Sequence, residues 1–285
     1  MLVDIPDRCL EGHVEGYALS SIGSNGRVSL YPRETKAHIP TRHPVIQTIG
    51  RTFDIANFGI ERAPILIGEI PDMDKFSRPG GFSVTDMPLK FPGTDYRLPM
   101  QLSQFEGVIQ QCIDYEYTIN PALDDYYVYL TIDQKQLVAG RGHRGTGIHS
   151  DGLQGPRWPT KMPAERTYLV TNTPAPVATK YYNQAFDMSG CDVDKHNLTA
   201  LFRAQADPAK SAYIPFRAIA MFDCYLTHEG PTSGTDSPRT LFKLLVSKRH
   251  FDRLGNTHNA LFDYDWDLGA RPLPDLLPPP SIDEI

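Results

Sequence analysis

The stretch "DYYVYLTID", residues 125–133, decides the class of fold, because its β-branched and aromatic residues are typical of a strand. Four later stretches share this composition and are separated by turn-forming residues: "RTYLVTN" (166–172), "ATKYYNQAF" (178–186), "YIPFRAIAMFD" (213–223) and "RTLFKLLVSK" (239–248). A doubly wound fold needs a helix between most strands, whereas this pattern has few helices. It therefore predicts a mainly β sandwich or barrel with flanking helices.

The chain before residue 125 has weaker signals. "APILIGEI" (63–70) has the length and composition of a strand, and Asn25-Gly26 favours a hairpin. Residues 78–99 contain too many glycines and prolines for a long regular element. Two segments have apolar residues at helical spacing, residues 101–117 and residues 192–207, so both are predicted to be helices.

The length and composition favour one folded domain. The chain has 285 residues, of which 40% are hydrophobic, and an all-β domain of this size is ordinary. We expect a core at about 125–250, an N-terminal buttress at 1–124 and a proline-rich arm at 268–285.

The charge and the cysteines limit the possible partners and compartments. A net charge of −6 offers no basic field for a nucleic acid, and no apolar stretch is long enough to span a membrane. The start "MLVDIPDRCLEGH" lacks the pattern of a signal peptide, and the four cysteines form no CxxC pair. We therefore expect a cytoplasmic protein with reduced cysteines; the sequence does not indicate its oligomeric state.

The stretch "TGIHSDGLQG", residues 146–155, raises the question of a metal site. Its His149-x-Asp151 pair supplies an imidazole and a carboxylate on one side of a strand end, but such a pair is also common in a polar loop. His228 is the best third ligand, because it follows a strongly apolar strand and precedes a glycine-proline turn. The second such pair, His250-x-Asp252, is followed by no strand that would carry a third ligand, so it is interpreted as a polar turn.

Arg239 opens the apolar strand "RTLFKLLVSK", eleven residues after His228. A guanidinium that enters an apolar strand needs a counter-charge, because its burial without a partner is costly. The partner is either a dicarboxylate bound to the metal, gripped at its far end, or an aspartate of the chain in an ordinary ion pair.

Together, His149, Asp151, His228 and Arg239 resemble the HxD…H…R pattern of the Fe(II)/2-oxoglutarate-dependent dioxygenase superfamily. The resemblance implies a double-stranded β-helix, also called a jelly-roll or cupin-like barrel. It implies that the two histidines and the aspartate are the iron ligands and the catalytic residues, and that Arg239 binds 2-oxoglutarate. It further implies an oxidoreductase that uses O2, with hydroxylation of a small molecule as the default outcome.

The residues that bind the remaining groups are less sharply indicated. Thr240 or Tyr168 would add a hydroxyl to the co-substrate carboxylate. A basic entrance would suit an anionic or zwitterionic substrate, such as an amino acid or a natural-product intermediate, although solvated loop charges would look the same. The entrance residues are Arg141, Arg144, Arg157 and Trp158, with His143 beside them.

Two alternatives of other classes stay open. A zinc-dependent hydrolase would use the same two histidines and aspartate with an activated water. A non-catalytic β-sandwich binding protein would need no metal, and the His-x-Asp pair would then be part of a turn.

Overall fold

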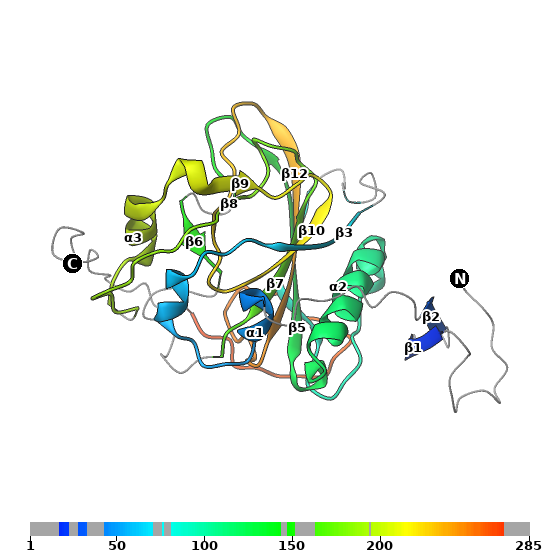
Figure 1. Cartoon of the computed structure of the whole chain (residues 1–285). Coiled ribbons are helices and arrows are strands. Elements are labelled where there is room, and N and C mark those ends of the chain that lie inside the picture. Colours follow the sequence, from blue (N-terminus) through cyan, green and yellow to red (C-terminus); the bar gives the residue numbers. More distant parts are fainter. Residues whose placement is uncertain are drawn as a thin grey trace.

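The computed structural model describes residues 17–22, 28–32, 43–70, 76, 81–143, 147–151, 163–193 and 195–270, with the backbone alone in the first two ranges. The described chain is mainly β, with two larger antiparallel sheets and few helices (Figure 1). A separate pair, β1 (Tyr17–Ile22) and β2 (Val28–Pro32), is antiparallel as the hairpin prediction requires; its turn, residues 23–27, lies outside the described residues.

The six-stranded sheet has the order β3-β10-β7-β12-β5-β4. Its strands are β3 (Ile65–Glu69), β4 (Phe82–Lys90), β5 (Tyr127–Leu137), β7 (Arg166–Thr171), β10 (Ala218–Asp223) and β12 (Ser237–Ser247). The longest pairing joins β12 to β5 over eleven residues without a shift of register. These strands include the stretches at 125–133 and 239–248, so the strand predictions there are confirmed.

The four-stranded sheet has the order β6-β11-β8-β9. Its strands are short: β6 (His149–Ser150), β8 (Lys180–Tyr182), β9 (Ser211–Tyr213) and β11 (Thr227–Glu229). Helix α3 (Leu198–Gln205) lies beside β6 in Figure 1. This sheet contains both histidines of the predicted metal site.

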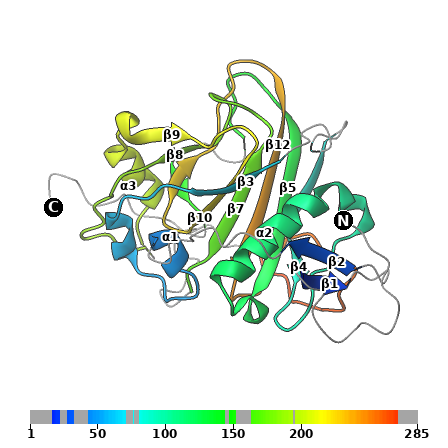
Figure 2. The same cartoon turned by 45° about the vertical axis from the view of Figure 1, so that its right-hand side comes forward.

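The outer face of the six-stranded sheet is the face covered by helix α2 (Glu106–Ile119), which crosses it in Figure 2. Phe242, Leu244 and Val246 of β12 belong to this apolar layer, as the alternation of a strand requires. Phe242 of β12, for example, stacks against Phe105 at 6.1 Å between ring centroids. A 3₁₀ turn, Met100–Phe105, leads into α2, and the helix predicted at 101–117 is confirmed.

The inner face of the same sheet is the face opposite α2. Its apolar residues form a smaller cluster with the four-stranded sheet: Leu169, Ile214, Ala220, Phe222 and Leu226, with Tyr181 and Leu241 packed against it. On β12, Arg239 and Lys243 lie on this face, on either side of Leu241. The inner face is therefore where charged groups and the predicted ligands meet.

Some sequence predictions about elements are wrong. The stretch 78–99 contains a nine-residue strand, β4, whose turn-forming residues are accommodated by two shifts of register against β5. The helix predicted at 192–207 begins only at Leu198, because the side chain of Asn197 caps the backbone N–H of Ala200. The strand predicted at 178–186 is limited to three residues, β8.

Short helical segments complete the described chain. They are helix α1 (Pro44–Gln47) and 3₁₀ turns at Ile55–Gly59, Leu123–Asp125 and Pro208–Lys210. Among the described residues, none of the helices has the length and apolar character needed to cross a membrane. Cys112, Cys191 and Cys224 are free thiols, and two of them are buried.

Candidate metal centre

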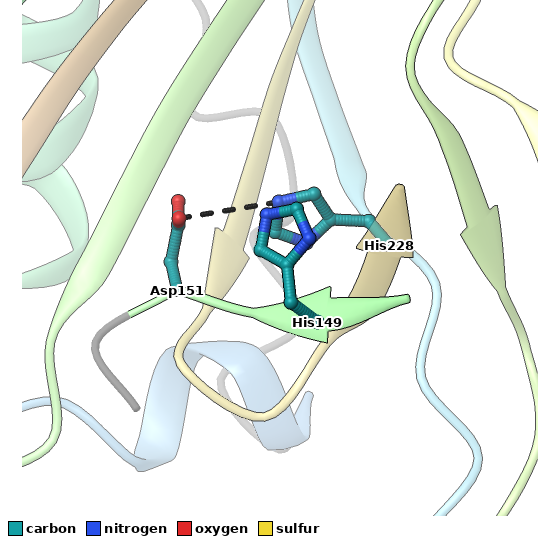
Figure 3. A group of neighbouring side chains, drawn as sticks. All are labelled: His149, Asp151 and His228. Carbon is teal, nitrogen blue, oxygen red and sulfur yellow. Dashed lines mark ion pairs between the residues drawn. The ribbon is translucent and has the colours of Figure 1, made fainter. Parts of the chain in front are cut away.

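The backbone brings the two predicted histidine ligands directly opposite each other. Strands β6 and β11 are antiparallel, and His149 and His228 are partners in their register (Figure 3). Side chains of such a pair project from the same face of a sheet, and their Cβ atoms are about 4.5–5.5 Å apart. Asp151 follows His149 by two residues, so it projects from that face as well.

The side chains converge as the sequence predicts. One ligand atom from each of His149, Asp151 and His228 lies within 4.8 Å of the other two. The imidazole rings are 4.6 Å apart between centroids, and Nε2 of His228 lies 4.0 Å from Oδ1 of Asp151. In Figure 3 the aspartate points toward the two rings from the side. The structure therefore brings together the three predicted ligands, although His228 lies 77 residues after Asp151 in the chain.

Hydrogen bonds fix which nitrogen of each imidazole is available. Nδ1 of His149 lies 2.8 Å from the carbonyl of Gly147, and Nδ1 of His228 lies 3.1 Å from the carbonyl of Leu226. A carbonyl can only accept, so each Nδ1 carries a proton, and the nitrogen with the lone pair in the neutral form of each ring is Nε2. Anchoring of a ligand histidine through its second nitrogen is a usual feature of metal sites.

Gly147 contributes to this arrangement through its backbone. Its φ of +124° lies in a region that side chains rarely adopt, and a Cβ there would come within 2.9 Å of Arg203. The conformation directs its carbonyl to His149. A glycine at this position is therefore a local reason why the loop delivers the first ligand in a fixed orientation.

The electrostatic environment keeps His228 in the form that binds metals. Burial, reinforced by the neighbouring His149, lowers the pKa of His228 to about 4, even though Asp151 opposes the shift. His228 is therefore neutral at physiological pH, as a metal ligand must be.

The donor set fits a divalent transition metal. Two neutral imidazoles and one carboxylate are the ligands of the facial triad that holds non-haem Fe(II), and the same atoms also suit Zn²⁺. Ligand bonds of about 2.1 Å place neighbouring donors about 3 Å apart, so binding would draw the three side chains slightly together. His149 and Asp151 are partly exposed, whereas His228 is buried.

Two residues that the sequence analysis missed hold the second oxygen of Asp151. Nζ of Lys243 lies 3.7 Å from Oδ2, and the hydroxyl of Thr167 lies 3.4 Å from the same atom. Strand alternation was the available signal, because a lysine four residues after Arg239 must share its face of β12.

Arg239 is buried on the inner face, as the apolar strand around it requires. Its guanidinium contacts Nδ1 of His143 and donates to the hydroxyl of Thr179 at 3.1 Å, while Nε2 of His143 lies 3.1 Å from Oδ2 of Asp133. Thr179 precedes Tyr181, the β8 partner of His228, by two residues. The guanidinium is therefore on the same side of the six-stranded sheet as the metal face.

Thr240 and Tyr168 do not lie with this site. The hydroxyl of Thr240 donates to the carbonyl of Phe76 at 2.9 Å, on the outer face of β12. The hydroxyl of Tyr168 donates to Glu116 of α2 at 2.6 Å, also on the outer face. Strand alternation explains both positions, because successive side chains of a strand project from opposite faces. Thr240 is next to the inner-face residue Arg239, and Tyr168 is next to the inner-face residue Leu169.

The predicted entrance residues are only partly described. Arg141 is exposed, whereas Arg144, Arg157 and Trp158 lie outside the described residues, so the basic entrance stays a prediction. His143 does not belong to an entrance, because it is buried against Arg239. Burial lowers the pKa of His143, which favours its neutral form.

The second His-x-Asp pair behaves as a polar turn. Nε2 of His250 lies 3.7 Å from Oδ2 of Asp252, and more than half of each side chain is exposed. The pair follows the end of β12 at Ser247, as predicted.

Comparisons with known proteins give only distant likenesses. No family model matches the chain, and no curated protein matches it. Among solved structures, EvdO2 from Micromonospora carbonacea var. aurantiaca has 19% identity and a TM-score of 0.36, over 52% of this chain and 62% of that one. AviO1 from Streptomyces viridochromogenes Tue57 has 10% identity and a TM-score of 0.39, over 70% and 96%.

A third structure, HygX from Streptomyces hygroscopicus with nickel and 2-oxoglutarate bound, has 10% identity and a TM-score of 0.35, over 71% of this chain and 84% of that one. The chain thus spans about three fifths of the EvdO2 structure and more of the other two. Likenesses at this level assign neither a family nor an activity, so the functional argument depends on the geometry of the site.

Proposed function

We propose that this protein is a non-haem Fe(II)/2-oxoglutarate-dependent oxygenase that acts on a small molecule. The observation that carries the proposal is the convergence of His149, Asp151 and His228, with their ligand atoms within 4.8 Å of one another. Two imidazoles and one carboxylate on one side of an ion leave the other positions for exchangeable ligands. We also propose that the two larger sheets are the two sides of a double-stranded β-helix.

The chain's own residues would bind and orient the reactants. His149, Asp151 and His228 would hold the iron, and Arg239 would bind the distal carboxylate of 2-oxoglutarate from the same side of the sheet. When bound, Fe(II), 2-oxoglutarate and O2 supply the oxidation of a substrate C–H bond, with succinate and carbon dioxide as the other products. Positioning is the protein's contribution, because the C–H bond nearest to the iron is the one oxidised.

The position of Arg239 supports its role in binding the co-substrate. Thr179 and His143 hold the guanidinium in a fixed orientation, and all three side chains are buried. A planar fork with a fixed orientation is suited to a carboxylate.

The test is aerobic incubation of the purified protein with Fe(II) and 2-oxoglutarate, with measurement of succinate. We expect succinate above a control without protein, even in the absence of the true substrate. Bound zinc without succinate would instead identify a hydrolase. Absence of any bound metal in protein purified without chelators would indicate the non-catalytic binding protein.

A further inference from the structure

Lys243 occupies an unusual place for a lysine, in the middle of an apolar strand and beside the metal face. It lies on the inner face of β12, paired with Thr131 of β5 and Leu169 of β7, and its side chain is 18% exposed. Its neighbours along β12, Phe242 and Leu244, are fully buried on the opposite face. Because desolvation of an ammonium is costly, this position needs an anionic partner.

The partner that the structure provides is one oxygen of the predicted metal ligand. Oδ2 of Asp151 lies 3.7 Å from Nζ of Lys243 and 3.4 Å from the hydroxyl of Thr167, while Oδ1 lies 4.0 Å from Nε2 of His228. The two oxygens of the carboxylate thus face different groups. Oδ1 faces His228, and Oδ2 faces β7 and β12.

We propose that Lys243 is a positioning residue of the metal centre, which retains Oδ2 so that Asp151 offers the ion Oδ1 alone. The inference rests on the metal centre proposed above. A carboxylate can bind a metal through one oxygen or through both, and the second mode occupies one more coordination position. By retaining Oδ2, Lys243 keeps that position for exchangeable ligands.

The charge of Lys243 predicts the sign of its effect on metal affinity. An ammonium beside the carboxylate competes with the ion for negative charge and repels a divalent cation. Replacement of Lys243 by an apolar residue of similar length should therefore tighten metal binding. It should also remove one open coordination position on the ion, because Asp151 would then bind through both oxygens. A residue that merely supported the fold would have the opposite effect, because its loss would loosen the ligands and weaken binding.

The experiment uses Mn²⁺ alone as the probe, with the full-length wild type, K243M and K243R. Titration gives the dissociation constant, and the relaxation rate of water protons reports the exchangeable water on the bound ion. We expect K243M to bind Mn²⁺ about tenfold more tightly, since effects of this size are usual for groups around metal ligands. We also expect slower relaxation of water protons, because the bound ion would hold fewer exchangeable waters. K243R, which keeps the charge, should restore both values toward the wild type.

A second variant tests the same claim through the other group that contacts Oδ2. T167V should change both quantities in the same direction as K243M but by less, because a hydroxyl at 3.4 Å is a weaker partner than an ammonium. Thermal unfolding without metal checks that each variant is folded, and T167V carries the test should K243M not fold.

The outcomes separate this inference from the proposed function. If K243M or T167V binds Mn²⁺ with unchanged water relaxation, Lys243 does not control the carboxylate and the inference is wrong. If K243M weakens binding and K243R does not restore it, the lysine is only structural. If the wild type binds no Mn²⁺, the metal centre itself is wrong, and the proposed function fails with it.

Discussion

The two faces of the six-stranded sheet each hold a cluster of charged groups, and the clusters differ in how deeply their members are buried. On the outer face, Arg166 donates two hydrogen bonds to Glu116, at 2.7 and 2.8 Å, and Tyr168 donates a third at 2.6 Å. All three residues are fully buried. On the inner face, Asp151 is partly exposed, and Thr167, Lys243 and His228 are among its neighbours, at 3.4 to 4.0 Å.

The difference indicates what each cluster is for. The outer cluster is a buried network in which short bonds join the two opposite charges, so its effect is on stability. The inner cluster places a partly exposed carboxylate beside two imidazoles, and these three groups are the donors that a divalent transition metal uses. Variants on each face should therefore affect different quantities: metal binding for the inner face and the free energy of unfolding for the outer face.

The largest expected effect is on the inner face. H228A should abolish the retention of iron and the formation of succinate, because two remaining donors do not hold the ion. The measurement is metal content after anaerobic reconstitution with Fe(II) and dialysis, followed by the succinate assay. H250A is the matched control, since His250 belongs to the exposed pair, and it should leave both values unchanged. Full iron content in H228A would show that the ligand assignment is wrong.

The next effect is on the outer face. E116A should lower the free energy of unfolding by about 3–5 kcal/mol, because it leaves the buried guanidinium of Arg166 without its carboxylate. Equilibrium unfolding in urea measures the loss. E61A removes the exposed pair with Lys210 and should cost about 0–1 kcal/mol. Equal losses of unfolding free energy in E116A and E61A would contradict the distinction between a buried network and a surface ion pair.

A smaller effect is expected at Arg239. R239A should raise the 2-oxoglutarate concentration for half-maximal succinate formation by about 10–100-fold, because one charged hydrogen-bonding partner of the co-substrate is lost. Iron should stay bound. The matched control is T240V, the next residue on the opposite face of β12, whose hydroxyl contacts Phe76. If T240V changed the 2-oxoglutarate requirement as much as R239A, the effect would come from the strand and not from the inner face.

Local composition was sufficient to predict the long strands and helix α2, because their apolar spacing is the same whatever packs against them. The convergence of His149, Asp151 and His228 was also predictable, since their residue types and the strand ends around them carry the signal. Strand β4 was not, because the register shifts that accommodate its Gly and Pro neighbours depend on pairing with β5. The shortened start of α3 depends on one capping side chain, that of Asn197.

The residues around the ligands were missed for a related reason. A strand's composition does not say which face is the inner one, so Lys243 and Thr240 are equivalent until the sheet is assembled. Once Arg239 is assigned to the inner face, alternation assigns Lys243 to it and excludes Thr240. Arg239 contacts Thr179 and His143, which come from segments far away in the chain. Sequence spacing does not report such contacts.

The smallest expected effect concerns a buried carboxyl near the end of β12. Glu165 accepts a hydrogen bond from Ser247 at 2.6 Å and one from Arg249 at 3.1 Å, yet burial raises its pKa above the usual 4.5. A carboxyl whose pKa is raised by folding contributes stability below its unfolded pKa, and the contribution is lost as pH rises through the folded pKa. Replacement by Gln removes the titration and keeps a group of the same shape.

E165Q should therefore gain stability relative to the wild type as pH rises from about 4 to about 7. The change in melting temperature should be small, within about 2–4 °C for a chain of this size, and thermal unfolding across the pH range measures it. If the wild type instead gained stability relative to E165Q as pH rose, the attraction of Arg249 would outweigh burial in setting the pKa of Glu165.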